Sequence, residues 1–291
     1  MPFDPSDFRV TSSSFHLKDH RTELASGLDK SELKELVVRD RARIAELQEL
    51  LFAEGTRSLL LIFQAMDAAG KDSCMAHLLT GVNPQGVHVK SFKQPSKEEL
   101  AHDFLWRHRN AVPAPGIIGV HNRSHYEEVL VVKVHPEYLT FRPSNGITDP
   151  AKADQAFWDK RYAAIRNWEA ELALANVTVM KFFLYMGKKE QKKRFLERIE
   201  DPKKNWKFSL GDVKERSHFD AYMKAYEEAI AATSTPQAPW FVVPADEQWE
   251  SRAIVSQLVR EQLEAMAPRM PVLDAKAKAE LADAKKMLEA E

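Results

Sequence analysis

The segment QAMDAAGKDS at residues 64–73 combines small residues, a glycine and a lysine in a pattern typical of phosphate binding. It follows the apolar run SLLLIFQ at 58–64, which predicts a strand, and it leads into a helical pattern at about 70–80. Small residues let successive backbone N–H groups point at an anion, the N-terminus of the helix adds positive charge, and Lys71 adds a mobile full charge. We therefore expect phosphate to be bound by Ala68, Ala69, Gly70, Lys71, Asp72 and Ser73.

The segment departs from the common phosphate-loop pattern GxxxxGK[ST] at two positions. Ala65 takes the place of the first glycine and Asp72 that of the Ser/Thr, with Ser73 one residue later. A tight turn with an exposed lysine is the alternative interpretation. Asp67 argues against it, because a carboxylate in a loop that attracts phosphate would repel the ligand unless a divalent cation lay between them. We predict that Asp67 binds Mg²⁺ together with phosphate oxygens.

A second polar segment, HNRSHYEE at 121–128, follows the apolar run IIGVH at 117–121. The carboxyl ends of parallel strands are where ligands bind in open α/β sheets. Arg123 can form two parallel hydrogen bonds to phosphate oxygens, and Glu127 could hold magnesium through water or accept hydrogen bonds from a sugar or base. We predict Asn122 and Glu127 as nucleotide-binding residues, and assign no role to His125. An ordinary ion pair between Arg123 and Glu127, four residues apart, is the alternative.

Residues 188–207 carry nine basic side chains against four acidic ones. Because they lie between the predicted fourth and fifth strands, they fit a mobile basic lid at about 187–210 that closes over phosphates. A solvated charged helix is the alternative. A second basic group flanks the second predicted strand. Together the two groups could line a channel longer than one nucleoside triphosphate requires, with Lys90, Lys93, Arg109, Lys188, Arg194 and Arg198 as candidate phosphate contacts.

The order of apolar runs and helical patterns predicts how these segments are held. Strands are predicted at 58–64, 86–92, 117–121, 177–185 and 240–243, and helices at about 29–55, 70–80, 97–109, 124–134, 151–175, 211–233 and 246–267. Capping boxes begin at Asp29 and Ser96, and Asp149 before Pro150 is a further predicted helix start. Near-continuous apolar strands separated by helices predict an α/β fold with a parallel sheet that is covered on both faces.

Length and composition limit the organisation and the compartment. A chain of 291 residues with 44% hydrophobic content predicts one domain at 29–267, an N-terminal arm at 1–28 and a helical extension at 268–291 that serves as a surface or subunit-contact helix. A net charge of −1 gives no global field for nucleic acid. The single cysteine, Cys74, excludes an internal disulfide and multi-cysteine metal sites. With no secretory leader and no run of about 18 apolar residues, we expect a cytoplasmic protein without a membrane partner.

Four sequence blocks together resemble one known family. QAMDAAGKDS, GVHNRSHYEEV, QKKRFLERIEDPKKNWKFS and APWFVVPADEQWESR occur in the order typical of the polyphosphate kinase 2 family, a resemblance that covers about residues 30–265. RSHYE, rather than RSWYN, is similar to the subgroup that phosphorylates both nucleoside mono- and diphosphates. The resemblance implies a three-layer α/β/α P-loop kinase-like sandwich with a parallel five-stranded sheet, a basic helical lid, magnesium dependence and homo-oligomers.

By motif position, the resemblance implies that Asp67, Lys71, Arg123 and Arg194 act at the reacting phosphates. Asn122 stands where many relatives carry an aspartate, which leaves Asp67 as the clearer Mg²⁺ ligand. The implied function is magnesium-dependent phosphoryl transfer between inorganic polyphosphate and adenine or guanine nucleotides. Two alternatives stay open at this point, namely an ATP-dependent nucleoside monophosphate kinase and a non-catalytic protein that binds polyphosphate or RNA.

Overall fold

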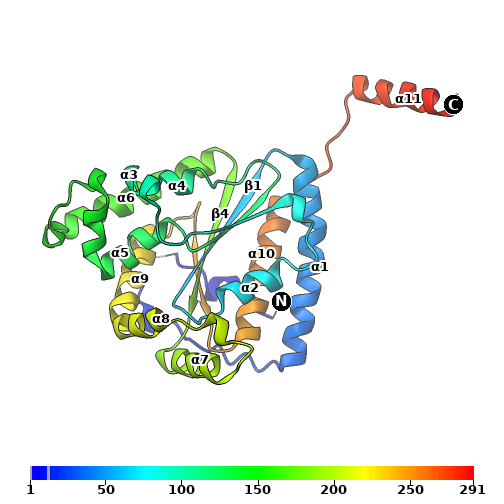
Figure 1. Cartoon of the computed structure of the whole chain (residues 1–291). Coiled ribbons are helices and arrows are strands. Elements are labelled where there is room, and N and C mark those ends of the chain that lie inside the picture. The colour runs from blue at the N-terminus through cyan, green and yellow to red at the C-terminus, as the bar shows by residue number, and fades with distance from the viewer. Residues whose placement is uncertain (1, 12–13) are drawn as a thin grey trace.

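The computed structural model describes residues 2–11 and 14–291. Its centre is a five-stranded sheet in which every neighbouring pair is parallel and the strand order is β2-β3-β1-β4-β5, with β1 in the middle (Figure 1). The strands are β1 (Ser58–Ala65), β2 (Val87–Ser91), β3 (Ile118–Asn122), β4 (Val177–Tyr185) and β5 (Trp240–Pro244). All five apolar runs therefore form strands, and the predicted parallel α/β sheet is confirmed.

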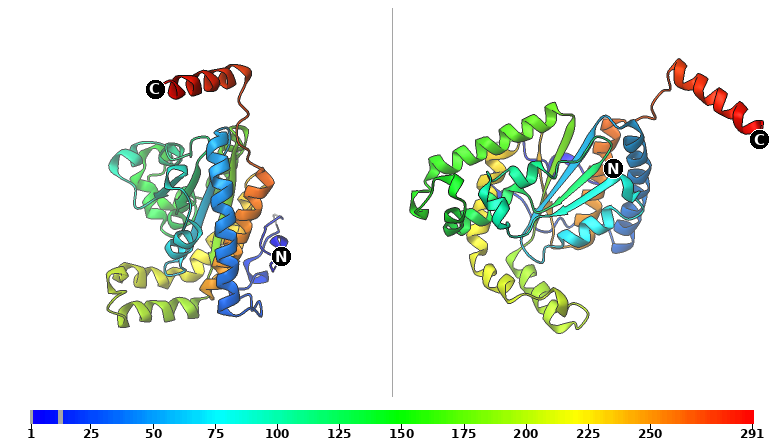
Figure 2. Two further views of the ribbon diagram at one scale, coloured as in Figure 1. Left: turned by 90° about the vertical axis from the view of Figure 1, so that its right-hand side faces the viewer. Right: turned by 45° about the horizontal axis from the view of Figure 1, so that its top comes forward.

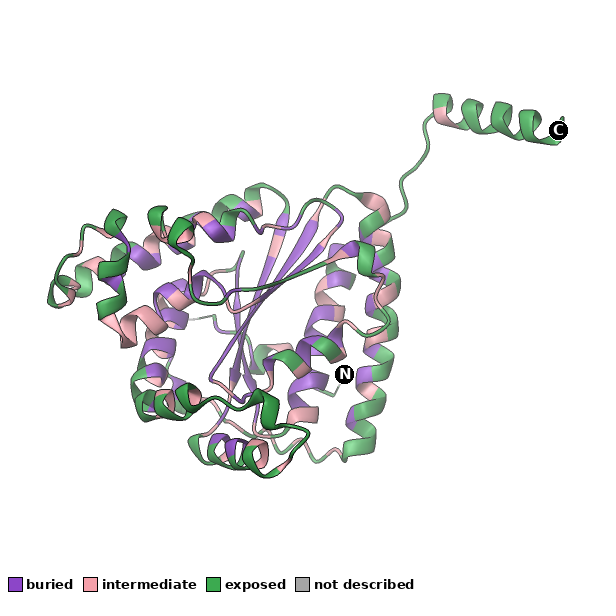
Figure 3. Ribbon diagram, viewed as in Figure 1, coloured by how far each residue is buried: buried purple, intermediate pink, exposed green. Residues whose placement is uncertain are grey.

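Strand β1 is buried along its whole length because both faces of the sheet are covered (Figure 3). Alternate side chains point to opposite faces of a strand, so Leu59 and Leu61 lie in one core while Leu60 and Ile62 lie in the other. One face is covered by α1 (Lys30–Glu54), α2 (Lys71–Leu78) and α10 (Gln248–Met266), and the other by α5 (Val131–Val134), α6 (Gln155–Leu174) and α9 (Phe219–Thr233) (Figures 1 and 2).

Two helix starts follow the predicted capping boxes. Asp29 accepts hydrogen bonds from the backbone of Ser31 and Glu32 at the start of α1, while the Glu32 carboxylate accepts one from the Asp29 N–H. Ser96 and Glu99 form the same reciprocal pair at the start of α3 (Lys97–Ala101). Local sequence therefore set these boundaries correctly.

Three predicted helices are wrong in extent, and a fourth, at 211–233, is interrupted by a 3₁₀ turn at Arg216–His218 that separates α8 (Leu210–Glu215) from α9. The pattern at 97–109 is split, because the Asp103 carboxylate accepts from the N–H of Leu105 and starts a new turn before α4 (Trp106–Arg109). The pattern at 124–134 opens as a 3₁₀ turn, with the Ser124 hydroxyl accepting from the backbone N–H of Tyr126. Asp149 caps only a short 3₁₀ turn, and α6 starts instead at Gln155, after Asp154, whose carboxylate accepts from the N–H of Phe157.

The N-terminal arm packs on the domain beside β5. Arg9 forms an antiparallel bridge with Phe241, and the buried side chains of Phe3 and Phe8 join one core while Phe15 joins the other. Among the described residues, no helix is both long enough and apolar enough to cross a membrane.

Two helical segments lie outside the two covering layers. The segment expected to form the lid contains α7 (Lys188–Glu200) and α8 (Leu210–Glu215), which lie below the carboxyl ends of the strands in Figure 1. At the other end of the chain, α11 (Ala275–Glu289) projects from the body, and within the described chain none of its residues is buried (Figures 1 and 3).

Candidate active site

The phosphate loop, residues 64–73, leaves the carboxyl end of the central strand and runs into α2. Two of its residues adopt left-handed backbone conformations, Ala68 with φ of 67° and Gly70 with φ of 97°. Such a conformation is strained for alanine and persists only where the surroundings hold it in place. The first N–H groups of α2 have no acceptor within their own helix, so the loop and the helix start form a site suited to an anion.

Lys71, the first residue of α2, lies beneath this loop rather than in solvent. Its side chain is only 9% exposed, and its Nζ donates to the carbonyl oxygen of Ala65 at 2.7 Å. Burial lowers the pKa of Lys71, and the nearby charge of Asp67 opposes that shift. The alternative of an exposed lysine on a simple turn is therefore wrong.

Arg123 joins the phosphate loop to the second predicted segment. Its Nη2 donates to Asp67 Oδ1 at 3.0 Å, and its Nη1 lies 3.4 Å from Glu127 Oε2. Arg123 itself has a positive φ of 63°. The Arg123–Glu127 pair considered as the alternative is thus present, but the same guanidinium also reaches the loop. Burial raises the pKa of Glu127, while the positive charge of Arg123 acts against that rise.

Asp212, at the start of α8, is a candidate that sequence reasoning missed. It lines the same cleft as Asp67, and its pKa is raised by burial and then by the negative charge of Asp67. In the sequence, Asp212 follows Ser209 by three residues and has the appearance of an ordinary helix cap; Ser209 does accept a hydrogen bond from the Asp212 N–H. No local signal distinguished it from a capping residue.

These carboxylates fit a magnesium ion held jointly by protein and substrate. No group of three His, Cys, Asp or Glu side chains in the described chain is arranged to hold a metal. Magnesium commonly keeps several waters and is bound through one or two carboxylates plus substrate phosphates. Asp67 and Asp212 supply oxygen donors of the right kind, and a cation near both would offset their mutual repulsion.

Three cavities meet at Arg123, which lines all of them. The largest, about 860 Å³, runs from the phosphate loop along α7 to the basic residues Lys204 and Lys207. Two smaller cavities of about 280 and 260 Å³ share Glu127 and Tyr138. The large cleft brings together most of the predicted site, namely Asp67, Ala68, Ala69, Gly70, Lys71, Asp72, Ser73, Lys93, Asn122, Arg123, Arg194 and Arg198.

Other predicted residues have different surroundings. Lys90, Arg109 and Lys188 line none of these three cavities in the described part of the chain. Arg109 pairs with Asp103 at 3.0 Å, and Lys188 pairs with Asp220 at 3.0 Å. These three cations were singled out by local charge density, which carries no information on where a side chain points.

Two further predicted residues in the large cleft already have protein partners. The Asn122 amide donates to Asp72 Oδ1 at 2.7 Å and so ties the end of β3 to the start of α2. Arg194 contacts the phosphate loop itself, because its Nη1 donates to the carbonyl oxygens of Ala68 and Ala69 at 3.2 and 3.1 Å. The predicted segments around α2, β3 and α7 therefore meet through direct hydrogen bonds.

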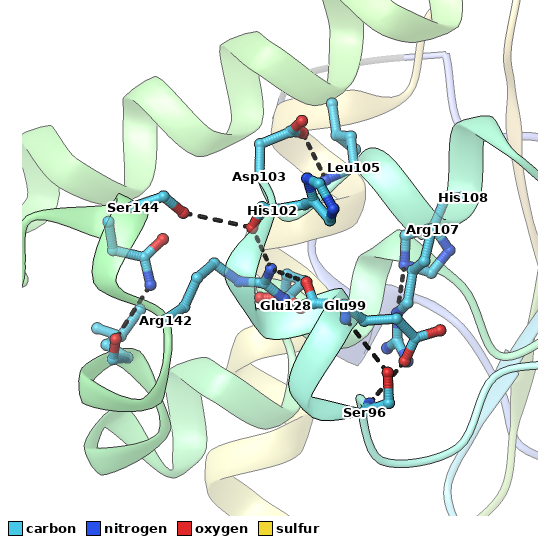
Figure 4. Close-up of polar contacts among 12 residues, drawn as sticks. Ser96, Glu99, His102, Asp103, Leu105, Arg107, His108, Glu128, Arg142 and Ser144 are labelled. Atoms are coloured by element: carbon cyan, nitrogen blue, oxygen red, sulfur yellow. Dashed lines mark hydrogen bonds and ion pairs between the residues drawn. The ribbon is translucent and has the colours of Figure 1, made fainter.

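Two buried arginines, Arg107 and Arg142, line the cavity of about 260 Å³. Figure 4 shows the polar contacts that hold them. Arg142 donates to Glu128 Oε1 at 3.0 Å and to the carbonyl oxygens of Glu99 and His102 at 2.7 and 2.6 Å. Arg107 lies 3.5 Å from the Glu99 carboxylate. These contacts join the segment 99–107 to Glu128 and Arg142, and they hold Glu128, the residue next to Glu127, in place.

Comparison with known proteins identifies this arrangement. The family model for polyphosphate kinase 2 matches residues 27–271. The chain is 48% identical over 242 residues to an ADP-polyphosphate phosphotransferase of Rhodopseudomonas palustris, covering 83% of each chain. It is 43% identical over 250 residues to an AMP/ADP-polyphosphate phosphotransferase of Meiothermus ruber, covering 86% of this chain and 88% of that one.

Solved structures agree with the sequence comparisons. The crystal structure of polyphosphate kinase 2 from Arthrobacter aurescens superposes with a TM-score of 0.87 at 41% identity and covers 98% of both chains. A putative polyphosphate kinase 2 from Pseudomonas aeruginosa gives a TM-score of 0.73 at 28% identity, covering 87% of this chain and 49% of that one. By sequence, by fold and by the order of its motifs, this chain belongs to the polyphosphate kinase 2 family.

Proposed function

We propose that this protein transfers phosphoryl groups reversibly between inorganic polyphosphate and nucleotides, converting AMP to ADP and ADP to ATP. The observation that carries the proposal is the large cleft, which begins at the phosphate loop and continues past Arg198 to Lys204 and Lys207. A mononucleotide would occupy only the loop end of it. A linear polyanion would use the whole basic wall, as the names of the two relatives also suggest.

The cleft has the groups that phosphoryl transfer needs. Most of the rate acceleration in this chemistry comes from holding donor and acceptor in line and neutralising charge on the moving group. We propose that Lys71 and Arg123 supply positive charge there, and that Gly70 and the start of α2 offer backbone N–H donors. The acceptor is a phosphate oxygen that is already ionised at neutral pH, so the attack requires no strong general base.

We propose that Mg²⁺ is the cofactor and that Asp67 and Asp212 hold it together with phosphate oxygens. When bound, the ion supplies charge neutralisation of the transferred phosphoryl group. Arg123 is already paired with Asp67 at 3.0 Å, so one guanidinium contacts both the metal-binding carboxylate and the junction of the cavities. This contact would set the position of the carboxylate before substrates arrive.

We propose that the nucleoside occupies the two smaller cavities. Both contain Glu127 and Tyr138, and both open at Arg123, where a nucleotide phosphate would reach the large cleft. Tyr138 offers an aromatic face for a base, and Glu127 offers an acceptor for a sugar or base donor. Acceptance of both AMP and ADP, as adenine or guanine nucleotides, belongs to this proposal.

We further propose that residues 29–267 form the catalytic unit and that the protein works as a homo-oligomer in the cytoplasm. The extent of the catalytic unit is supported by the family match at 27–271, which ends before α11. The homo-oligomer is supported by the exposed apolar side chains of α11, with Leu281 58% and Leu288 70% exposed. The single buried cysteine, Cys74, is compatible with a reducing compartment.

A product assay tests the activity directly. Purified protein is incubated with polyphosphate and either AMP or ADP, with and without magnesium, and a parallel AMP reaction receives ATP in place of polyphosphate. The nucleotides are separated by chromatography. We expect ADP from AMP and ATP from ADP only when magnesium is present. Product from AMP only when ATP is the donor would instead indicate a nucleoside monophosphate kinase. Retention of polyphosphate without any nucleotide product would indicate a binding protein.

A further inference from the structure

Arg194 has every one of its donors occupied by the protein. A guanidinium has five N–H donors, and in Arg194 all five have an acceptor. Nη1 donates to the carbonyl oxygens of Ala68 and Ala69 at 3.2 and 3.1 Å, and Nη2 to those of Ala245 and Asp246 at 2.7 and 2.8 Å. Nε donates to Glu190 Oε1 at 2.9 Å. A phosphate could gain a hydrogen bond from Arg194 only if one of these contacts broke.

The face of α7 that carries Arg194 also binds the loop carbonyl that precedes those of Ala68 and Ala69. Gln191, one turn before Arg194 and 1% exposed, donates from Nε2 to the carbonyl oxygen of Asp67 at 3.1 Å. Three successive loop carbonyls, at 67, 68 and 69, are therefore directed toward α7. In a planar trans peptide the N–H of the next residue points the opposite way. The N–H groups of Ala68 and Gly70 are thereby turned away from the α7 side chains that bind these carbonyls.

The loop needs this restraint because its backbone is strained. Ala68 has a φ of 67°, a conformation that costs an alanine about 1 kcal/mol or more and relaxes unless it is held. The carbonyl of that same residue is one of the two that Arg194 Nη1 binds. The contact therefore acts on the strained residue itself.

Arg194 forms a brace between the phosphate loop and a second segment, which lies just beyond β5 in the sequence block APWFVVPADEQWESR. Its residues Ala245 and Asp246 supply the other two carbonyl acceptors of Arg194. The Asp246 carboxylate also accepts from the N–H of Gly187, the residue before α7, at 2.7 Å. Gly187 lies so close that a Cβ there would be 3.1 Å from Asp246 Oδ2. Asp246 thus fixes the start of the helix that carries Arg194.

From these contacts we infer that Arg194 and Asp246 are positioning residues, which act on catalysis by setting the orientation of the phosphate-loop peptide groups. The first two turns of α7 then belong to the fixed scaffold of the loop. Movement of the lid is confined to the chain beyond Arg194. This inference rests on the proposed phosphoryl transfer for its kinetic consequences, but not for its structural ones.

Four variants separate positioning from direct charge stabilisation. Arg194→Lys keeps the charge but cannot donate to both pairs of carbonyls. We expect it to lower kcat about as much as Arg194→Ala, on the order of 100-fold, with KM for ADP within about threefold of wild type. Asp246→Ala should lower kcat about tenfold, whereas Asp246→Asn, which keeps the oxygen acceptor, should stay close to wild type.

Amide hydrogen exchange provides a readout that needs no turnover. The peptides covering residues 67–73 should exchange faster in Arg194→Lys and Asp246→Ala than in wild type. Arg166→Lys is the matched control, since Arg166 also donates to a carbonyl, that of Ala232 at 2.6 Å, but away from the loop. It should leave both loop exchange and kcat unchanged. Thermal unfolding of every variant checks that the fold is retained.

Two results would overturn the inference. One is an Arg194→Lys protein with at least a tenth of the wild-type kcat while Arg194→Ala loses about 100-fold, because charge alone would then suffice. The other is unchanged loop exchange in a folded Arg194→Lys protein. If wild-type protein forms no nucleotide product from polyphosphate, the proposed function fails, and the exchange comparison still decides whether the brace orders the loop.

Discussion

At the scale of single residues, Asp67 carries the magnesium hypothesis. Its carboxylate is 27% exposed in the cleft and is paired with Arg123. Asp67→Asn keeps the shape of the side chain but removes the charge that would hold the cation. We expect the magnesium concentration for half-maximal rate to rise by tenfold or more, on the order of the losses seen for other metal-site substitutions, together with a lower maximal rate.

A magnesium titration of the initial rate measures both effects. Asp159→Asn, an exposed carboxylate on α6 away from the cleft, serves as the control and should match wild type. If Asp67→Asn has the wild-type midpoint and maximal rate, Asp67 serves the structure only.

Glu127 is predicted to help decide which nucleotide is accepted. It lines both smaller cavities and lies 3.4 Å from Arg123, where in the proposed placement the nucleotide phosphates reach the large cleft and an AMP would lack its β-phosphate. Glu127→Asn should therefore reduce kcat/KM for AMP about tenfold more than for ADP, a difference of about 1.4 kcal/mol. Steady-state kinetics with each acceptor measure the ratio. Equal losses would give Glu127 a general role, and no loss would leave only its ion pair with Arg123.

Residue positions could be predicted from the sequence only where the backbone context decides them. Gly70 and Lys71 were expected between a strand and a helix, and they do lie at the start of α2; their roles stay predictions. Arg194 lies in a basic run and was expected to face the phosphates, whereas its partners are carbonyls that lie 51 and 126 positions away along the chain. Such partners become neighbours only through the sheet, so no local pattern could indicate them.

At the scale of elements, α7 contacts the phosphate loop on one face and lines the large cleft farther along its length. Its buried face, with Gln191 and Arg194, holds the phosphate loop, while Arg198 one turn later lines the cleft and lies 3.7 Å from Asp212. If the brace inference holds, the proposed lid at 187–210 would begin beyond Arg194 rather than at residue 187.

Arg198→Ala should weaken the use of long polyphosphate more than that of short chains. We expect KM for long polyphosphate to rise on the order of tenfold while KM for ADP changes little, because one charge of an extended basic wall is lost; added salt should reproduce part of the effect. Lys192→Ala removes an exposed charge of the same helix that does not line the cleft, and should have a smaller effect. Identical behaviour at every chain length would assign this part of α7 to an ordinary solvated helix.

At the scale of the whole molecule, the alternation of apolar runs and helical patterns was sufficient to predict a parallel sheet, since such strands are buried on both faces. It also predicted that the candidate site segments follow the carboxyl ends of the strands, and the phosphate loop and Arg123 do follow β1 and β3. The breaks within 97–109 and 124–134 were missed, because Asp103 and Ser124 each accept a hydrogen bond from the backbone N–H two residues later, and such local turns compete with a helix that the apolar spacing alone predicts.

Buried histidines should make the fold sensitive to acid. His121, 1% exposed on β3, has its pKa lowered from 6.5 to about 4 by burial. Between these pH values the unfolded chain binds a proton that the folded protein does not, so the free energy of unfolding falls as pH decreases, by up to about 1.4 kcal/mol per pH unit for this group. The pKa of His108 and of His125 is lowered by burial in the same direction.

Denaturant unfolding at several pH values measures this loss. His121→Gln can still donate to the Ala111 carbonyl that His121 Nε2 contacts at 3.0 Å, but it does not titrate. Its free energy of unfolding should fall less steeply between pH 6.5 and 4 than that of wild type. Parallel pH profiles for the two proteins would remove His121 from this explanation.

The central claim is that polyphosphate itself is the phosphoryl donor, and ³¹P NMR tests it most directly. Wild-type protein is given polyphosphate, magnesium and ADP as the sole nucleotide, with Lys71→Ala as the inactive control. We predict that one polyphosphate residue disappears for each ATP formed and that AMP does not accumulate. ATP and AMP appearing in equal amounts while polyphosphate stays intact would contradict the account, because ADP would then be both donor and acceptor.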